Sequence, residues 1–204
     1  MFDIKDPDES EEGRDSLMVI SPERLKKITD FVENNKISLL RSPPSSGKST
    51  LGQALRDHFD SRGYDSIYIS LAGINGKEEI NDEKLFNKFW NDKVGCTWTE
   101  ISKFKKDTYI FVDEIQVIYG DSAPFFWGTL KELISSEENS PLRILFLGTY
   151  HLTLDPKVTP VEFHHTLGLN NLLLGWEELN QLTNNFIQLH TLNGSELFSI
   201  PKDI

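Results

Sequence analysis

The amino-acid sequence predicts an α/β domain built around a parallel β-sheet. Two short runs, residues 109–112 and 144–147, are apolar throughout, which is the pattern of strands buried on both faces. Strand-like and helix-like segments also alternate along the chain, and this alternation is typical of a sheet covered by helices on both faces. At 204 residues the chain has room for one ordinary domain.

Local signals give the predicted helices and strands. Ser21 followed by Pro22 marks a helix start, because Ser caps a first turn and Pro suits the first helical position. Gly63 marks a helix end, since glycine readily adopts the left-handed conformation that closes helices. The expected helices are 22–34, 51–61, 82–91, 98–104, 124–135 and 176–189, and the expected strands are 37–40, 66–71, 109–112, 144–147 and 172–174. The last helix is expected to bury Leu179, Leu182 and Phe186.

The charge is negative and unevenly distributed. The net charge is −11, and residues 1–16 alone hold seven acidic against two basic residues, so we predict a disordered acidic tail there. An acidic surface argues against broad binding to DNA or RNA, which depends on Lys and Arg, so nucleic acid is not indicated as a partner. The basic cluster Lys103, Lys105 and Lys106 is interpreted as a solvated loop.

Neither export nor a membrane is indicated. The sequence shows no N-terminal basic-then-apolar segment and no apolar run that approaches membrane-spanning length. The single Cys96 cannot form an internal disulfide. We therefore expect a cytoplasmic or otherwise intracellular protein with no membrane partner.

The pattern that carries chemistry is the strand, tight loop and helix between residues 37 and 59. A phosphate chain needs many donors, and a loop at a helix N-terminus supplies backbone N–H groups together with the positive end of the helix. Gly47 lets the backbone approach, Lys48 would reach the β- and γ-phosphates, and Ser49 would give its hydroxyl to Mg²⁺. The predicted phosphate loop comprises Ser42, Pro43, Pro44, Ser45, Ser46, Gly47, Lys48, Ser49 and Thr50.

The phosphate loop departs from the pattern G-x-x-x-x-G-K-[ST] at its first position, where Ser42 replaces glycine. Ser42 is expected to enter the loop with a less permissive backbone, and Pro43 and Pro44 are expected to stiffen the rest of the loop. The alternative interpretation is a Ser/Pro/Gly turn that happens to precede a helix. The buried strand before the loop, the loop length and the Gly-Lys-hydroxyl run together favour the phosphate site.

An acidic pair ends the predicted strand 109–112. Asp113 is expected to support the Mg²⁺ shell through water, and Glu114 is expected to orient and activate the attacking water. The alternative is an ordinary exposed pair at a strand-to-loop junction. Thr149 comes after the strand 144–147 and is either a hydroxyl for the γ-phosphate or the lytic water, or a plain loop residue.

Residues 42–50, 109–116 and 144–149 resemble the Walker A, Walker B and sensor-1 segments of P-loop ATPases with an extra central strand, the AAA+ and STAND branch. The resemblance covers residues 18–190 and implies a three-layer αβα P-loop NTPase fold that favours ATP over GTP. It also implies a five-stranded parallel sheet in the order 5-1-4-3-2, with strands that start near Ile37, Ser66, Tyr109, Leu142 and Asn170. More narrowly, the Pro-Pro loop and the run DEIQ resemble ATPase modules of Crinkler-type fungal and oomycete proteins, and only that resemblance would imply delivery into a host cell.

The same resemblance divides the chain into the tail 1–16, an NTPase core at 17–175 and the start of a helical lid at 176–204. The lid is shorter than in the family, so the chain is expected to be a core with a truncated lid. Arginines stop at Arg143, which leaves no sensor-2 arginine in the last segment. Arg143 or a neighbouring subunit remains as the source of an arginine finger, and slow turnover is expected.

Three functions use such a site. The first is ATP binding and Mg²⁺-dependent hydrolysis coupled to a conformational change, with Lys48, Glu114 and Thr149 in catalytic roles and Ser49 and Asp113 at the metal. The second is a nucleotide-binding switch that scarcely hydrolyses and presents a surface to a protein partner or a second copy of the chain. The third is a kinase for a small substrate, which rarely needs the acidic pair.

Two other groups of residues are assigned no site. His164 and His165 lack a third ligand at suitable spacing, so we do not interpret them as a metal site. The aromatic residues Phe89, Trp90, Phe125, Phe126, Trp127 and Trp176 are interpreted as core packing rather than as base-stacking platforms.

Overall fold

The computed structural model describes residues 19–74, 80–104, 106–119, 123–136, 141–149 and 160–192. The chain divides into two compact units, one of Leu25–Leu173 and one that combines Met1–Arg24 with Leu174–Ile204. The predicted acidic tail, 1–16, lies outside the described residues, so its disorder remains a prediction.

A five-stranded sheet forms the centre of the larger unit. Its strands are β1 (Ile37–Arg41), β2 (Asp65–Ser70), β3 (Thr108–Asp113), β4 (Leu142–Gly148) and β5 (Thr166–Leu167). They lie in the order β2-β3-β4-β1-β5, and each pairing is parallel. The predicted α/β class and the order 5-1-4-3-2 are confirmed, because this is the same order counted from the opposite edge.

The helices of this unit lie close to the predicted segments. The α-helices are α2 (Pro22–Asn34), whose first residues belong to the other unit, α3 (Lys48–Ser61), α5 (Glu83–Val94) and α6 (Pro124–Ser135). Short 3₁₀ helices are η1 (Leu71–Gly73), η2 (Trp98–Lys103), η3 (Ile115–Ile118) and η4 (Leu169–Asn171). Ser21 caps α2 as predicted, since its hydroxyl accepts from the Arg24 N–H at 3.3 Å.

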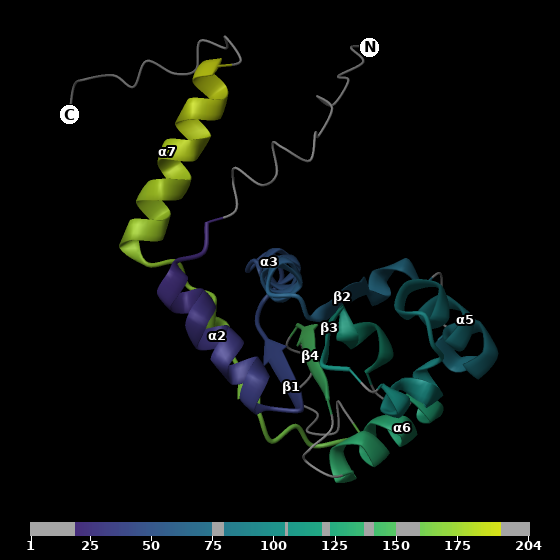
Figure 1. Ribbon diagram of the computed structural model, residues 1–204. Helices are drawn as coiled ribbons and strands as arrows, with labels where there is room; N and C mark the ends of the chain where they lie inside the picture. Colours follow the sequence, from purple (N-terminus) through teal and green to yellow (C-terminus); the bar gives the residue numbers. More distant parts are fainter. Residues whose placement is uncertain are drawn as a thin grey trace, which may run out of the picture. The chain divides into compact units, whose positions relative to one another are not determined.

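Helix α3 covers one face of the sheet and helices α5 and α6 cover the other (Figure 1), and the side chains of β3 alternate between the two. Tyr109 and Phe111 stack on Phe59 of α3, with ring centroids 3.8 and 6.0 Å apart. Ile110 and Val112 belong to the other core, which α5 and α6 cover. Because strand side chains alternate in direction, Asp113 shares the α3 face with Tyr109 and Phe111.

Aromatic side chains fill the core beneath α5 and α6. Trp98 and Phe126 stack with ring centroids 4.2 Å apart, and Trp90 meets Trp98 edge-on at 4.7 Å. Trp127 is also buried, and Phe89 and Phe125 pack against the same cluster. Core packing of these helical aromatic residues is therefore confirmed.

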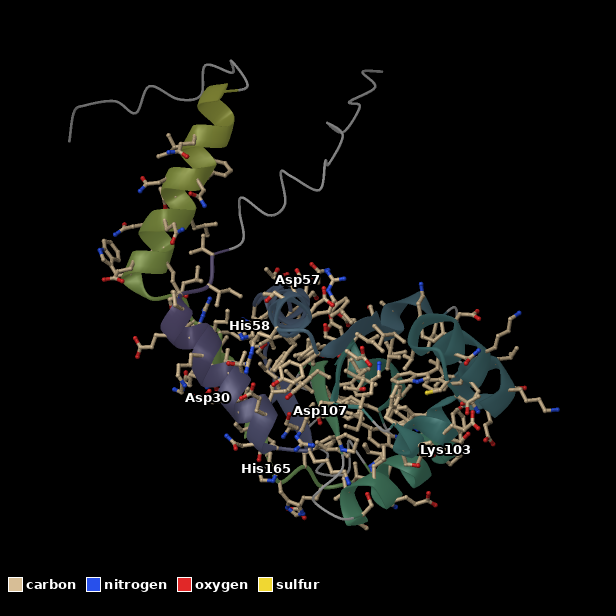
Figure 2. The ribbon with its side chains drawn as sticks, in the orientation of Figure 1. Asp30, Asp57, His58, Lys103, Asp107 and His165 are labelled. Carbon is tan, nitrogen blue, oxygen red and sulfur yellow. The ribbon has the colours of Figure 1, made fainter. Side chains whose placement is uncertain are left out.

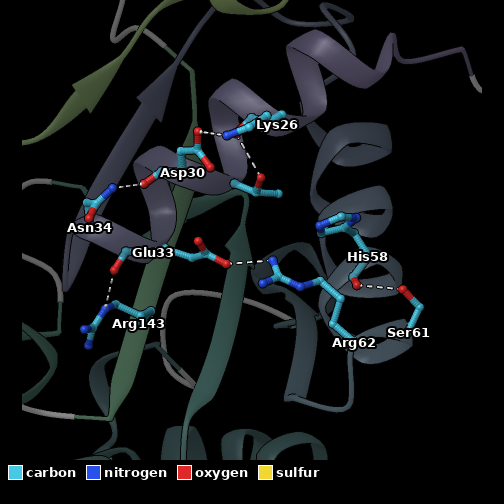
Figure 3. Close-up of polar contacts among 9 residues, drawn as sticks. Lys26, Asp30, Glu33, Asn34, His58, Ser61, Arg62 and Arg143 are labelled. Carbon is cyan, nitrogen blue, oxygen red and sulfur yellow. Dashed lines mark hydrogen bonds and ion pairs between the residues drawn. The ribbon is translucent and has the colours of Figure 1, made fainter.

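Glu33, near the end of α2, connects that helix to two other elements (Figure 3). Its carboxylate pairs with Arg62, just after α3, at 2.7 Å. Its backbone carbonyl accepts from Nε of Arg143 at 3.0 Å. Arg143 is thus held at the beginning of β4.

The predicted last strand, 172–174, is wrong. The fifth strand is β5. Just before β5, the backbone carbonyl of His165 accepts from the backbone N–H of Leu39 at 3.0 Å. Leu172 is buried, but Leu173 is 57% exposed. A run of three leucines does not distinguish a strand from a connecting segment, because it is too short to show a period.

The helix α7 (Trp176–Leu192), in the smaller unit, exposes residues that were predicted to be buried. Leu179 is 44% exposed, Phe186 is 52% exposed and Trp176 is 75% exposed. Helical periodicity identifies an apolar face but not what covers it, so the prediction of inward packing is wrong for these residues. Among the described residues, no helix combines the length and apolar character needed to cross a membrane.

Gly52 of α3 fits directly against β2 and β4. A Cβ atom there would lie 2.6 Å from Cδ1 of Leu147 and 2.8 Å from Cε2 of Tyr68. We expect Gly52→Ala to lower the free energy of unfolding by about 1–3 kcal/mol, as overpacking does, in a urea denaturation experiment. The control is Gly128→Ala in α6, where nothing lies within 4 Å of the added atom. It should raise the free energy of unfolding by about 0.5–1 kcal/mol, and equal effects of the two changes would contradict this account.

Candidate functional site

The carboxyl ends of β1, β3 and β4 meet at one edge of the sheet. The register pairs Arg41 with Gly148 and Val112 with Phe146. The segments that come after these strands are the phosphate loop, the turn at Glu114 and the residue Thr149. In open α/β sheets this edge is where ligands bind, so the topology brings the predicted site residues to a suitable place.

The phosphate loop leads into α3 through two left-handed residues. Gly47 has a φ of 87° and Ser45 has a φ of 57°. Such turns direct successive backbone N–H groups to a common point and form concave anion sites. A Cβ atom on Gly47 would meet nothing within 4 Å, so the backbone is open to an approaching ligand there.

Ser42, which stands where the common pattern has glycine, enters the loop with a backbone that serine adopts readily. The described loop residues with a positive φ are Ser45 and Gly47, and Ser42 is not one of them. Ser42 is fully buried, its N–H donates to the Gly148 carbonyl at 3.2 Å, and its hydroxyl bonds to that of Ser46. A serine at this position therefore ties the loop to β4 and to itself.

Lys48 lies under the phosphate loop with only 5% of its surface exposed. Its ammonium donates to the carbonyls of Ser42 at 3.2 Å and Pro43 at 2.8 Å. Burial lowers the pKa of Lys48, and the carboxylates of Glu114 and Asp113 partly oppose that effect. An ammonium has three donors, so one remains for an anion in the loop.

Asp113 is a buried carboxylate with both oxygens engaged. It is 1% exposed. Its Oδ1 accepts from the Glu114 N–H at 2.8 Å, and its Oδ2 accepts from the Tyr68 hydroxyl at 2.6 Å. The alternative of an ordinary exposed acidic pair does not describe this residue.

Gln116 connects the ends of β3 and β4. Its amide nitrogen donates to the Glu114 carboxylate, and its amide oxygen accepts from the Thr149 N–H at 3.1 Å. Glu114 itself is half-buried and has a left-handed backbone with a φ of 60°. Sequence reasoning assigned Gln116 no role, because the only signal was its place two residues after Glu114.

A cavity of about 700 Å³ opens among these segments. Its walls are formed by Pro44, Ser45, Ser46, Gly47, Lys48, Ser49, Thr50, Glu114, Gln116 and Thr149. Most of the predicted site residues are thus brought together around one space. Ser42, Pro43 and Asp113 are not part of the wall.

The donors present fit a magnesium ion that is held jointly with phosphates. The Ser49 hydroxyl and the Asp113 carboxylate are oxygen ligands of the kind that Mg²⁺ prefers, and the Asp113 carboxylate also accepts from the Tyr68 phenol. Within the part of the chain that the structure describes, no group of three His, Cys, Asp or Glu side chains could hold a metal alone. The remaining ligands of an ion at Ser49 would therefore come from phosphate and water.

A second cavity, of about 580 Å³, lies at the amino ends of β1 and β4. Arg143 and the pair His164 and His165 line it, and His165 is labelled in Figure 2. Arg143 begins β4, whereas Thr149 comes after its end, and at about 3.3 Å per residue the strand separates them by roughly 20 Å. Arg143 is therefore too distant to act as an arginine finger in the site of its own chain.

The basic cluster that sequence analysis interpreted as a solvated loop is solvated at its described positions. Lys103, which is labelled in Figure 2, is 71% exposed and pairs with Glu100 at 2.9 Å. Lys106 is 83% exposed, with Asp65 at 3.9 Å. Lys105 lies outside the described residues.

No protein-family model matches the sequence, and none of the curated proteins matches it significantly. Solved structures do match. A DNA replication initiation factor has a TM-score of 0.53 at 12% identity, over 86% of this chain and 51% of that one. The replication initiator DnaA bound to AMPPCP and single-stranded DNA has a TM-score of 0.50 at 16% identity, over 89% and 55%. The FIGL-1 AAA domain in complex with ADP has a TM-score of 0.46 at 19% identity, over 87% and 58%.

At these identities the likeness shows the fold alone, and the P-loop NTPase fold expected from the sequence is confirmed. The chain spans between 51% and 58% of the length of these three structures. The narrower resemblances, to the STAND branch and to Crinkler-type modules, remain predictions.

Proposed function

We propose that this chain binds ATP with Mg²⁺ and hydrolyses it slowly, with turnover coupled to a conformational change. One observation carries the proposal. The phosphate loop with Lys48, the acidic residue Glu114 and the strand-end residue Thr149 line a single cavity at the carboxyl edge of the sheet. ATP rather than GTP is favoured by the family resemblance of the sequence.

In the proposed complex the backbone N–H groups of the phosphate loop and the ammonium of Lys48 bind the β- and γ-phosphates. Ser49 would ligate the magnesium ion directly, and Asp113 would support it through water. The ion would neutralise charge on the phosphates. Two of the three described non-glycine residues with left-handed backbone, Ser45 and Glu114, belong to this site, and such strained residues cluster at functional sites.

The catalytic role proposed for Glu114 is to orient and activate the attacking water. Gln116 would hold the carboxylate of Glu114 against the Thr149 backbone, so the water and the γ-phosphate are positioned by adjacent strands. Thr149 would offer its hydroxyl to either one. These roles depend on geometry that brings three strand ends within reach of each other.

The second candidate is a nucleotide-binding switch with little or no hydrolysis. It is supported by the place of Arg143 at the amino edge of the sheet, away from the site of its own chain. We propose that a second copy or another protein supplies the arginine finger. Under this proposal the segment 176–204, which begins with α7, is the start of a lid that reports the bound state to that partner.

The experiment that tests the proposal is a titration with ATP and GTP, with and without Mg²⁺, and then a phosphate-release assay. At 100 times the dissociation constant, binding stabilises a fold by about 2.7 kcal/mol, which a thermal-shift assay detects readily. Binding with phosphate release supports the ATPase, and binding without it supports the switch. The absence of any shift with either nucleotide would overturn both.

Removal of the Lys48 ammonium should weaken ATP binding strongly. Hydrogen bonds to charged groups are among the strongest in proteins, so Lys48→Ala is expected to weaken ATP binding by at least about 100-fold in calorimetry. The matched control is Lys103→Ala, which removes an exposed ammonium far along the chain. Wild-type affinity in the Lys48 variant would contradict the proposed site.

Glu114→Gln should separate binding from hydrolysis. The amide has nearly the shape of the carboxylate but cannot take a proton, so ATP affinity should be preserved while phosphate release falls by roughly 10²–10⁴-fold. Glu83→Gln, at an exposed position in the first turn of α5, is the control. Unchanged phosphate release by Glu114→Gln would remove this residue from the mechanism.

Gln116→Ala should affect the same step by another route. Without the amide, Glu114 loses a partner and the Thr149 N–H loses its acceptor, so phosphate release should fall by on the order of tenfold through misplacement. ATP affinity, measured by calorimetry, should stay within about twofold of the wild type because Gln116 is not assigned a phosphate contact. A loss confined to affinity would argue against the positioning role.

A further inference from the structure

The hydroxyl of Tyr68 contacts one of the two side chains assigned to the metal. It donates to Oδ2 of Asp113 at 2.6 Å. Tyr68 belongs to β2, beside β3 in the sheet, and is paired in register with Phe111. Neither the motif nor the spacing of the sequence pointed to this residue.

We propose that Tyr68 opposes Mg²⁺ binding at this site, because its hydroxyl holds the Asp113 oxygen that a water of the metal shell would otherwise bind. Tyr68 is thus a positioning residue that acts on the cation through Asp113. This inference rests on the proposed function and adds a residue that regulates how readily the site binds Mg²⁺.

The buried charge of Asp113 is already satisfied without a cation. A carboxylate that is 1% exposed requires hydrogen-bond partners, and in this structure the backbone of Glu114 and the phenol of Tyr68 supply them. Asp113 is absent from the cavity wall, whereas Ser49 forms part of it. A cation that enters from the cavity therefore finds Ser49 accessible and Asp113 already bound to the phenol.

The ring of Tyr68 has room to reach Asp113 because α3 carries a glycine beside it. Gly52, one helical turn after Lys48, has no side chain, and a Cβ atom there would lie 2.8 Å from Cε2 of Tyr68. The glycine therefore lets a tyrosine ring pass between α3 and the sheet. A phenol keeps its proton at neutral pH, so Tyr68 is a donor toward Asp113.

The consequence is a competition between an internal hydrogen bond and the cation. ATP alone can engage the phosphate loop without breaking the bond between Tyr68 and Asp113. The water that would link Mg²⁺ to Asp113 must displace the Tyr68 hydroxyl. The protein would then require a higher Mg²⁺ concentration than the same site without the hydroxyl.

The test compares wild type, Tyr68→Phe and the control Tyr64→Phe by calorimetric titration. ATP affinity is measured first in EDTA, and Mg²⁺ is then titrated into the protein with ATP at a fixed saturating concentration. Tyr68→Phe should bind ATP in EDTA as the wild type does and reach its half-maximal Mg²⁺ response at roughly tenfold lower Mg²⁺, the lower end of what a hydrogen bond to a charged group contributes. Tyr64, which packs on Phe59 and Tyr109, should leave both values unchanged.

Each outcome decides the proposal. An unchanged or weaker Mg²⁺ response of folded Tyr68→Phe would overturn it, because the hydroxyl would then be neutral toward the cation or support it. A thermal melt in EDTA establishes folding, and Tyr68→Met is the second variant if the phenylalanine protein does not fold. Wild type that binds ATP while the variants show no gain in Mg²⁺ affinity rejects the inference alone, whereas wild type that binds no ATP rejects the proposed function as well.

Discussion

The parallel hydrogen-bond ladder that joins β1 to β4 and β4 to β3 is the constraint on which the candidate site depends. Because Arg41 lies opposite Gly148 and Val112 opposite Phe146, three connecting segments leave the sheet at the same edge. A shift of one residue in the pairing of β3 with β4 would turn Asp113 from the α3 face to the α5–α6 face. The buried aromatic residues on both faces of β3 oppose such a shift, since each alternate side chain has its own core.

The charged groups Lys48 and Asp113 have hydrogen-bond partners within the protein. Lys48 donates to two loop carbonyls, and Asp113 accepts from a backbone amide and a phenol. Buried charges require such partners, because an unsatisfied one would destabilise the fold. A ligand here therefore exchanges internal hydrogen bonds for its own, and its net affinity reflects the difference between the two sets.

The phosphate loop departs from the common pattern at Ser42, and internal hydrogen bonding accommodates the change. The first position needs no left-handed backbone in this chain, and the Ser42 hydroxyl closes the loop on Ser46. The left-handed residues come later, at Ser45 and Gly47, where the chain turns into α3. Strain is thus placed where the backbone faces the cavity.

The sequence by itself determined the α/β class, the strand order implied by the family resemblance and the position of the phosphate loop, because these depend on local periodicity and on a motif contiguous in the chain. The tertiary structure decided the partners of the acidic pair. Tyr68 reaches Asp113 across 45 residues of sequence and Gln116 reaches Thr149 across 33, and such contacts result from strand register, which no local pattern encodes. The tertiary structure also decided that Leu179 and Phe186 are exposed and that the fifth strand is Thr166–Leu167. An apolar run in the sequence indicates that its side chains favour burial, but it does not indicate which surface covers them.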